Sequence, residues 1–171
     1  GSTAIVGAIE EDTGGSNAGA AYIFTRSGST WTEQAKIQAS DKAAPAVFGW
    51  SVALSSDGNT AVVGARRHNP VGYDAGAAYI FTRSGSTWTE QAKIESSDIE
   101  AGDQFGFSVS LSSDGNTAVV GSKAEGTGGL ENAGAAYIFT RSGSTWTEQA
   151  KIQSSDIATY NFFGSSVSIS G

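Results

Sequence analysis

The sequence predicts an all-β fold built from repeated antiparallel hairpins, because two stretches recur along the chain at regular spacing. The first stretch, AGAAYIFTRSGSTWTEQAKI, occurs three times without one change, at residues 18–37, 75–94 and 133–152. The copies are 57 and then 58 residues apart. An exact internal repeat of this length indicates an architecture of identical stacked units.

Each copy of this block has the pattern of a β-hairpin. Two runs rich in β-branched and aromatic residues, AAYIFT and TWTEQAKI, flank Ser-Gly-Ser. Strand-forming runs on both sides of a short turn that contains glycine are typical of two antiparallel strands. We name them strand C and strand D, the third and fourth strands of the repeating unit.

The second repeated stretch predicts the first two strands of the unit. Residues 48–65 match residues 105–122 at nearly every position, and both contain Asp-Gly between apolar alternations. Asp-Gly is a strong hairpin signal, because both residues tolerate positive φ. We therefore expect strand A from Phe-Gly to Ser-Ser and strand B over Thr-Ala-Val-Val-Gly, so that one unit is an antiparallel A-B-C-D meander.

Four-stranded meanders that repeat without any helical period are the signature of β-propeller blades. A β-solenoid is the alternative, but its coils are usually shorter and do not need such sharp reversals. The prediction is a single three-repeat unit over residues 1–171, with blades at 48–95 and 105–152 and strands B to D of a split blade at 3–37.

Both ends of the sequence contribute to that split blade. Residues 3–7 have the pattern of strand B, and residues 163–170 have the pattern of strand A. Three blades are too few for a closed ring, which normally has four to eight. We therefore expect strand A of one chain to complete the B-C-D sheet of another, in a homodimer with a six-bladed ring. A nine-bladed trimer and a fragment of a longer propeller are the alternatives.

Composition and charge exclude several functions. The net charge is −7 and the only basic cluster is Arg66-Arg67, which argues against a nucleic-acid surface. No apolar run approaches the roughly 20 residues that span a bilayer, so membrane insertion is not expected. The chain has no Cys, and a Ser-His-Asp triad would depend on His68, the single His, without a Gly-x-Ser-x-Gly elbow. We predict neither an enzyme nor a cofactor.

Phe-Gly at the start of strand A and Val-Gly-Ala at the end of strand B resemble the FG-GAP repeat. That family builds the propeller of integrin α chains and of many bacterial surface proteins. The resemblance covers essentially the whole chain, and it implies a binding module that is extracellular or at the cell surface. The motifs are Phe48-Gly49, Phe105-Gly106 and Phe163-Gly164, with Val6-Gly7-Ala8, Val63-Gly64-Ala65 and the variant Val120-Gly121-Ser122.

The family's calcium loop does not carry over to this sequence. Its pattern, Asp-x-Asp-x-Asp-Gly between strands A and B, is here Ser-Ser-Asp-Gly-Asn. Calcium takes six to eight oxygen ligands, which one carboxylate in a tight hairpin cannot supply. We therefore expect no metal site at Asp57 or Asp114.

Loops at one end of every blade vary in length and chemistry, whereas those at the other end are nearly invariant. The variable D-to-A and B-to-C loops are where a ligand is expected, because binding residues concentrate on loops carried by a rigid scaffold. Long loops also drift without any selection for binding. The candidate ligand-binding residues, where these loops meet strand A, are Trp50, Phe107, Tyr73, Tyr160, Arg66 and Arg67.

Other recurring side chains are expected to serve the fold. The strand D tryptophans should pack between blades, the aspartates after Ser in the D-to-A loops should cap turns, and His68 should be solvated. The tryptophans are Trp31, Trp88 and Trp146, and the aspartates are Asp41, Asp98 and Asp156.

Two classes of function follow. The first is a binding module whose variable face holds a glycan or a protein ligand, including a lectin-like propeller. The second is a structural or engineered self-assembling scaffold without a specific ligand, which the identity of the three blocks favours.

Overall fold

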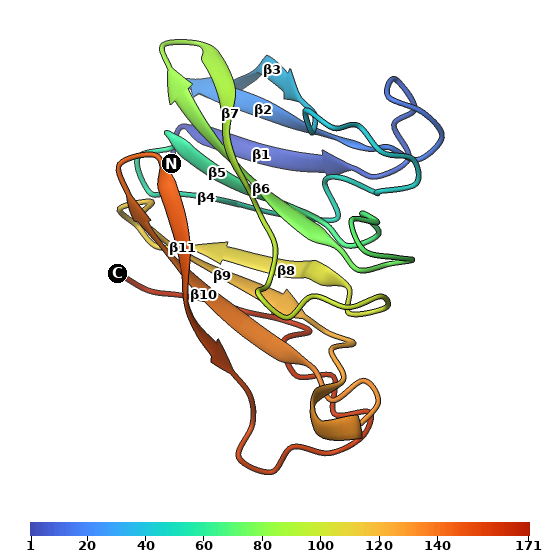
Figure 1. The fold of residues 1–171 in the computed structure, drawn as a ribbon. Helices are drawn as coiled ribbons and strands as arrows, with labels where there is room; N and C mark the ends of the chain where they lie inside the picture. Colours follow the sequence, from blue (N-terminus) through green and yellow to red (C-terminus); the bar gives the residue numbers. More distant parts are fainter.

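The computed structural model describes all 171 residues as three antiparallel β-sheets stacked one on another (Figure 1). The first sheet has the order β1 (Thr3–Ala8), β2 (Ala20–Ser27), β3 (Thr30–Ile37). The second has the order β4 (Ser51–Leu54), β5 (Thr60–Ala65), β6 (Ala77–Ser84), β7 (Thr87–Ile94). The third has the order β8 (Phe105–Leu111), β9 (Thr117–Ser122), β10 (Ala135–Ser142), β11 (Thr145–Ile152). No helix has the length and apolar character needed to cross a membrane.

The predicted C-D hairpins are confirmed, and they are identical in all three copies. In the first, Ala21 pairs with Ile37 and Ser27 with Thr30, with a register shift between Ile23 and Phe24. The same register and the same shift recur in the other two hairpins. The turn glycine, for example Gly28 with φ 62°, adopts the left-handed conformation that favours glycine.

The Asp-Gly hairpins differ in detail from the prediction. In each Asp-Gly pair only the glycine, Gly58 or Gly115, has positive φ, and the loop between β4 and β5 is wider than two residues. Its shape comes from Asp57, whose Oδ1 accepts hydrogen bonds from Ser55 Oγ at 2.6 Å and from the Asn59 amide at 2.9 Å. The side chain of Asp57 thus satisfies backbone and hydroxyl donors that a tighter turn would leave free.

The Phe-Gly and Val-Gly motifs meet where one sheet crosses the next. A Cβ on Gly64 would lie 2.1 Å from the carbonyl oxygen of Gly106, and one on Gly121 would lie 2.0 Å from that of Gly164. No side chain fits at such a distance, so backbone packs directly on backbone. Two motifs 40 or more residues apart in sequence are therefore one contact in space.

Alternation along each strand gives every sheet two apolar faces. We call the face that carries Val63 and Tyr79 in the second sheet the front face, and the face that carries Val62 and Ile80 the rear face. The front face of the second sheet packs on the rear face of the first, and the front face of the third packs on the rear face of the second. Phe48 and Phe105, at the start of each A segment, are buried in these two cores.

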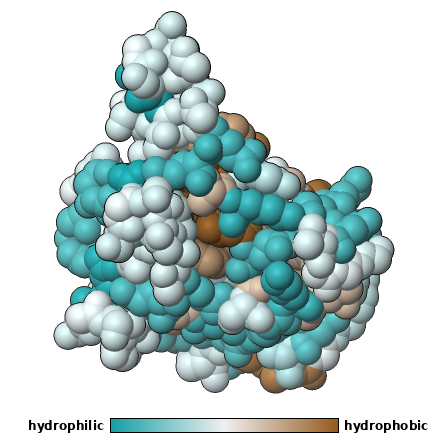
Figure 2. Space-filling model, turned by 90° about the horizontal axis from the view of Figure 1, so that it is seen from above, coloured by the Kyte–Doolittle hydropathy of each residue, from teal (hydrophilic) through white to brown (hydrophobic).

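The outer faces of the stack lack such a partner. Val6, on the front face of the first sheet, is 52% exposed, whereas its equivalents Val63 and Val120 are completely buried. Figure 2, which looks down on the molecule from above, shows a hydrophobic patch in a central hollow, with further hydrophobic atoms at the edges of the view. At the other end, Ile152 on the rear face of the third sheet is 41% exposed, while Ile94 is 5% exposed.

Residues 163–170, predicted as strand A, take no place in a sheet within this chain. The Phe163 amide donates to the Ala133 carbonyl at 3.0 Å, just as Phe48 and Phe105 are tied to the preceding sheet. The segment therefore lies where strand A of a following sheet would start. It stays irregular because no strand lies beside it to accept and donate ladder hydrogen bonds.

Candidate functional site

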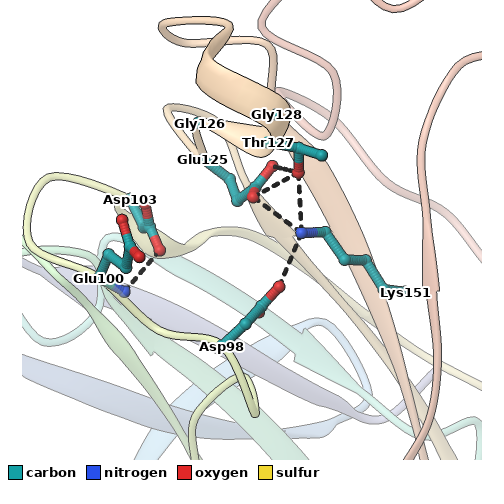
Figure 3. A pocket seen from close by; sticks show the side chains of 8 residues that line it. All are labelled: Asp98, Glu100, Asp103, Glu125, Gly126, Thr127, Gly128 and Lys151. Atoms are coloured by element: carbon teal, nitrogen blue, oxygen red, sulfur yellow. Dashed lines mark hydrogen bonds and ion pairs between the residues drawn. The ribbon is translucent and has the colours of Figure 1, made fainter.

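A polar cluster joins the second and third sheets at the strand ends where the variable B-to-C and D-to-A loops lie (Figure 3). Asp98, in the loop after β7, accepts hydrogen bonds from Tyr137 Oη and from Lys151 Nζ, both at 2.7 Å. Lys151 Nζ also contacts Glu125 Oε1 at 2.7 Å and Thr127 Oγ1 at 2.9 Å. We call this arrangement of one aspartate with a tyrosine and a lysine of the next sheet the Asp-Tyr-Lys latch.

The latch holds its aspartate and its lysine in their charged forms. Burial raises the pKa of Asp98, but hydrogen bonds from Lys151 and Tyr137 outweigh burial, so the net pKa lies below the ordinary value. Burial lowers the pKa of Lys151, yet contacts with Asp98 and Glu125 raise it above the ordinary value. An ammonium between two carboxylates is stabilised by charge-assisted hydrogen bonds, which exceed neutral ones in strength.

The same latch joins the first and second sheets. Asp41 accepts from Tyr79 Oη at 2.7 Å and from Lys93 Nζ at 3.1 Å. His68 stands in the place of Glu125, with Nε2 at 2.7 Å from Lys93 Nζ. Asp41 and Asp98 therefore do not cap turns, as the sequence suggested, but connect sheets.

The expectation that His68 is solvated is wrong. Its side chain is buried beside Tyr79 and Lys93. Burial, followed by the charge of Lys93, lowers the pKa of His68 below its ordinary value. The imidazole of His68 contributes to the latch through its contacts with Tyr79 Oη and Lys93 Nζ.

A polar cavity of about 250 Å³ lies next to the latch and is lined by four carboxylates. Asp103 is buried, and burial raises its pKa to about 6, with the charges of Glu125, Glu100 and Asp98 acting in the same direction. The single ammonium of Lys151 is shared between the carboxylates of Asp98 and Glu125. The chain contains no group of three or more His, Asp or Glu side chains arranged to hold a metal ion.

Aromatic and cationic side chains alternate in a row across the loops next to strand A. Arg66 Cζ lies 3.9 Å from the ring centroid of Trp50 and 6.0 Å from that of Phe107. Lys123 Nζ lies 4.6 Å from the centroid of Phe107 and 5.0 Å from that of Phe162. We call these five residues the cation-aromatic row, and their distances are in the range of cation-π contacts.

The structure brings together some of the predicted ligand-binding residues and separates others. Trp50, Arg66 and Phe107 belong to the row, and Tyr160 lies at its end, 6.1 Å from Phe162 between ring centroids, with its hydroxyl bonded to Glu131. Tyr73 is 70% exposed. Arg67 instead points to Asp74, with Nε 3.8 Å from Oδ2.

Lys123 and Phe162 are members of the row that sequence reasoning missed. Lys123 follows Val-Gly-Ser at the position that Arg66 occupies after Val-Gly-Ala, so the repeat alignment contained the signal. Phe162 precedes the third Phe-Gly, where the other repeats have Val47 and Gln104, and no repeat pattern marks it. Chemically the row offers flat apolar rings next to positive charge, which suits a sugar or a carboxylate.

Recurrent tryptophans and glutamates make further contacts between sheets. Trp88 Nε1 donates to Gln34 at 3.1 Å, and Trp146 Nε1 donates to Gln91 at 2.9 Å. Both rings pack against the cores between sheets, as expected, whereas Trp31 is 45% exposed in this chain. Glu90 accepts two hydrogen bonds from Ser40, both at 2.8 Å. Each contact joins a residue of one sheet to a residue of the preceding sheet or of the loop that follows that sheet.

Comparison with known proteins identifies the repeat. The family model described as FG-GAP repeat matches residues 1–24, 31–81, 88–139 and 146–171. A search of curated protein sequences finds no significant match. Among solved structures, TolB from Acinetobacter baumannii is similar, with a TM-score of 0.45 and 13% sequence identity. That similarity covers 87% of this chain and 30% of the TolB chain. Because the FG-GAP model accounts for most of the residues, this chain belongs to the FG-GAP repeat family.

Proposed function

We propose that this chain is a non-enzymatic FG-GAP repeat module that assembles with a second copy of itself into one closed six-bladed ring. Residues 163–170 of each copy become strand A of the first sheet of the other copy. All six sheets then have four strands. The two contacts between the copies, which we call the seams, are related by a two-fold axis. FG-GAP repeats are typical of extracellular and periplasmic proteins, so we place the assembly outside the cytoplasm.

The observation that carries this proposal is the exposure of residues at the outer faces that are buried at every internal contact. Ile152 and Ile94 belong to identical 20-residue blocks, yet one is 41% and the other 5% exposed. Val6 and Val63 differ still more, at 52% and 0%. Placing the front face of a first sheet on the rear face of a third sheet would bury both side chains as the internal sheets bury theirs.

The remaining cavity on the rear face has the composition of an internal core. About 280 Å³ are lined by Val119, Ala136, Ile152, Phe163 and Val167, together with small polar residues. The second sheet has an equivalent space on its rear face, and Val120 and Tyr137 of the third sheet fill it. Val6 and Tyr22 of a second copy are their counterparts; in the single chain Val6 is exposed and Tyr22 is half-buried, whereas Val120 and Tyr137 are completely buried.

Backbone hydrogen bonding gives a second reason for association. In the first sheet β1 pairs only with β2, so one side of β1 is a free edge. Free edges that carry apolar side chains pair readily with another strand. Residues 163–170 repeat the pattern of β4 and β8, with Val167 and Ile169 in the places of Val52 and Leu54.

Light scattering coupled to size exclusion tests the assembly. We expect the mass of two chains, and we expect Val6→Asp or deletion of residues 163–171 to abolish it. Val71→Asp is the matched control, because Val71 is 59% exposed in a loop away from either outer face. A single-chain mass at all concentrations, with or without these changes, would refute the proposal.

A second candidate function is ligand binding at the cation-aromatic row. It is favoured by Arg66 Nε, which is buried without a hydrogen-bond partner while its guanidinium lies on Trp50. We propose a glycan or an acidic peptide as the ligand class. An array of both classes tests it: a hit should be lost in Trp50→Ala and kept in Tyr73→Ala. An array without any hit would eliminate this candidate.

A further inference from the structure

We propose that Asp156 is the acceptor of a third Asp-Tyr-Lys latch, which forms only between two copies of the chain. Its carboxylate would receive hydrogen bonds from Tyr22 Oη and Lys36 Nζ of the second copy. This inference rests on the proposed assembly and specifies the polar contacts that make one copy recognise another.

The two internal latches provide the template. Asp41 binds Tyr79 and Lys93, and Asp98 binds Tyr137 and Lys151, in each case across a sheet boundary. In both, the aspartate follows a serine in the D-to-A loop, and the donors come from strands C and D of the next sheet. Asp156 has the same position after β11, and Tyr22 and Lys36 have the same positions in β2 and β3.

The donor side of the third latch is already formed in the single chain. Lys36 Nζ lies 6.0 Å from the ring centroid of Tyr22, and the corresponding distance between Lys93 and Tyr79 is also 6.0 Å. Glu11 accepts from Lys36 at 2.7 Å, as Glu125 does from Lys151. Only the aspartate is missing from this group.

The acceptor side is exposed in the single chain. Asp156 is exposed, and it accepts a hydrogen bond only through its main-chain oxygen, from Asn161. A carboxylate at one outer face and a lysine-tyrosine pair at the other are complementary in charge and hydrogen bonding. Two further contacts should form between copies in the same way. Ser97 donates to Glu148 within the chain, and Ser155 should donate to Glu33 of the second copy. Trp146 donates to Gln91 within the chain, and Trp31 of the second copy should donate to Gln149.

The register of the new strand pair follows from the second sheet. There Val52 pairs with Val63 and Leu54 with Ala61. Equivalent positions place Val167 opposite Val6 and Ile169 opposite Ala4 of the second copy. Directly paired residues in antiparallel strands have Cα atoms about 4.5 to 5.5 Å apart, which a disulfide can bridge.

Cysteine cross-linking tests the assembly separately from the latch. The chain has no Cys, so the only thiols are those introduced. Mixing the Val6→Cys and Val167→Cys variants under mild oxidation should give a covalent dimer of one chain of each kind. Mixing Val71→Cys with Val167→Cys is the control, and it should give none.

Sedimentation equilibrium tests the latch. We expect Asp156→Ala to weaken association at least tenfold, because two charge-assisted hydrogen bonds are lost at each seam. Tyr22→Phe should weaken association in the native background and add little in the Asp156→Ala background, as coupled partners do. Asp98→Ala is the matched control: it should lower the melting temperature of the chain and leave the dissociation constant within about threefold of the native value.

The possible results distinguish the latch from the assembly. Cross-linking together with an unchanged dissociation constant in Asp156→Ala would overturn the latch and leave the dimer in place. Absence of cross-linking and a single-chain mass would overturn both. Equal weakening by Asp156→Ala and Asp98→Ala would show a general loss of stability and would also contradict the latch.

Discussion

The three identical blocks allow one substitution to be compared at three positions of the same chain. Ile37, Ile94 and Ile152 are each preceded by the same 19 residues, and they end the same strand of their sheets. Ile37 and Ile94 are each 5% exposed in the two cores, whereas Ile152 is 41% exposed. Substitution by alanine should therefore cost different amounts of folding free energy, although the local sequence is identical.

The magnitude follows from burial. Removing a fully buried isoleucine side chain to alanine costs 2–5 kcal/mol, so we take about 3 kcal/mol for Ile37→Ala and Ile94→Ala. If the loss scales with the buried fraction, Ile152→Ala costs about 2 kcal/mol in the single chain. The difference, about 1 kcal/mol, should be lost from the free energy of association at each seam. Association should therefore weaken roughly fivefold for one seam and about thirtyfold for two.

Urea unfolding and sedimentation equilibrium measure the two parts. Unfolding is followed at the lowest protein concentration, where the mass is that of one chain, and association is measured without urea. We expect Ile152→Ala to be the mildest of the three variants in unfolding and the most damaging in association. Equal unfolding costs for all three, with unchanged association, would refute the reasoning from the outer faces.

Three other predictions concern single sites. Burial raises the pKa of Asp103 to about 6, so the folded state favours the protonated side chain. The contribution of Asp103 to folding stability is therefore full below about pH 4 and is lost as the pH rises through 6. Asp103→Asn should raise the melting temperature at pH 7.5 and leave it nearly unchanged at pH 4. Gly64→Ala should lower the free energy of unfolding in urea by roughly 3 kcal/mol or more, because the new Cβ would lie 2.1 Å from the Gly106 carbonyl oxygen. Gly143→Ala is the control. It should cost only about 1–2 kcal/mol, because no atom lies within 4 Å of its Cβ and only the φ of 63° is unfavourable. Millimolar calcium should leave the melting temperature unchanged, because Asp57 bonds to its own loop; a rise of several degrees would contradict this.

Much of the fold could be predicted from local sequence. The C-D hairpins need only a strand-forming run on each side of a glycine turn, and three identical blocks give three identical registers. The pairing of Phe-Gly with Val-Gly could be recognised as a motif. The reason for it, contact of backbone with backbone at Gly64 and Gly121, required the positions of neighbouring sheets.

The candidate site was predicted less completely. Trp50, Arg66 and Phe107 were expected near one another and lie in one row, but Lys123 joins them from the loop after β9 and Phe162 from beyond the last strand. Such contacts depend on how sheets stack, which local patterns do not encode. The same limit explains why His68 was expected on the surface and lies buried.

The sequence by itself determined the strands, their turns and the repeat, because these depend on residues close together along the chain. Only the tertiary structure decided what identical residues do. Asp98 accepts hydrogen bonds from a tyrosine and a lysine of the next sheet, whereas Asp156, at the same position in its repeat, faces solvent. The physical reason is that burial and hydrogen bonding between sheets depend on which sheet lies alongside, and the two outer faces of this stack have none.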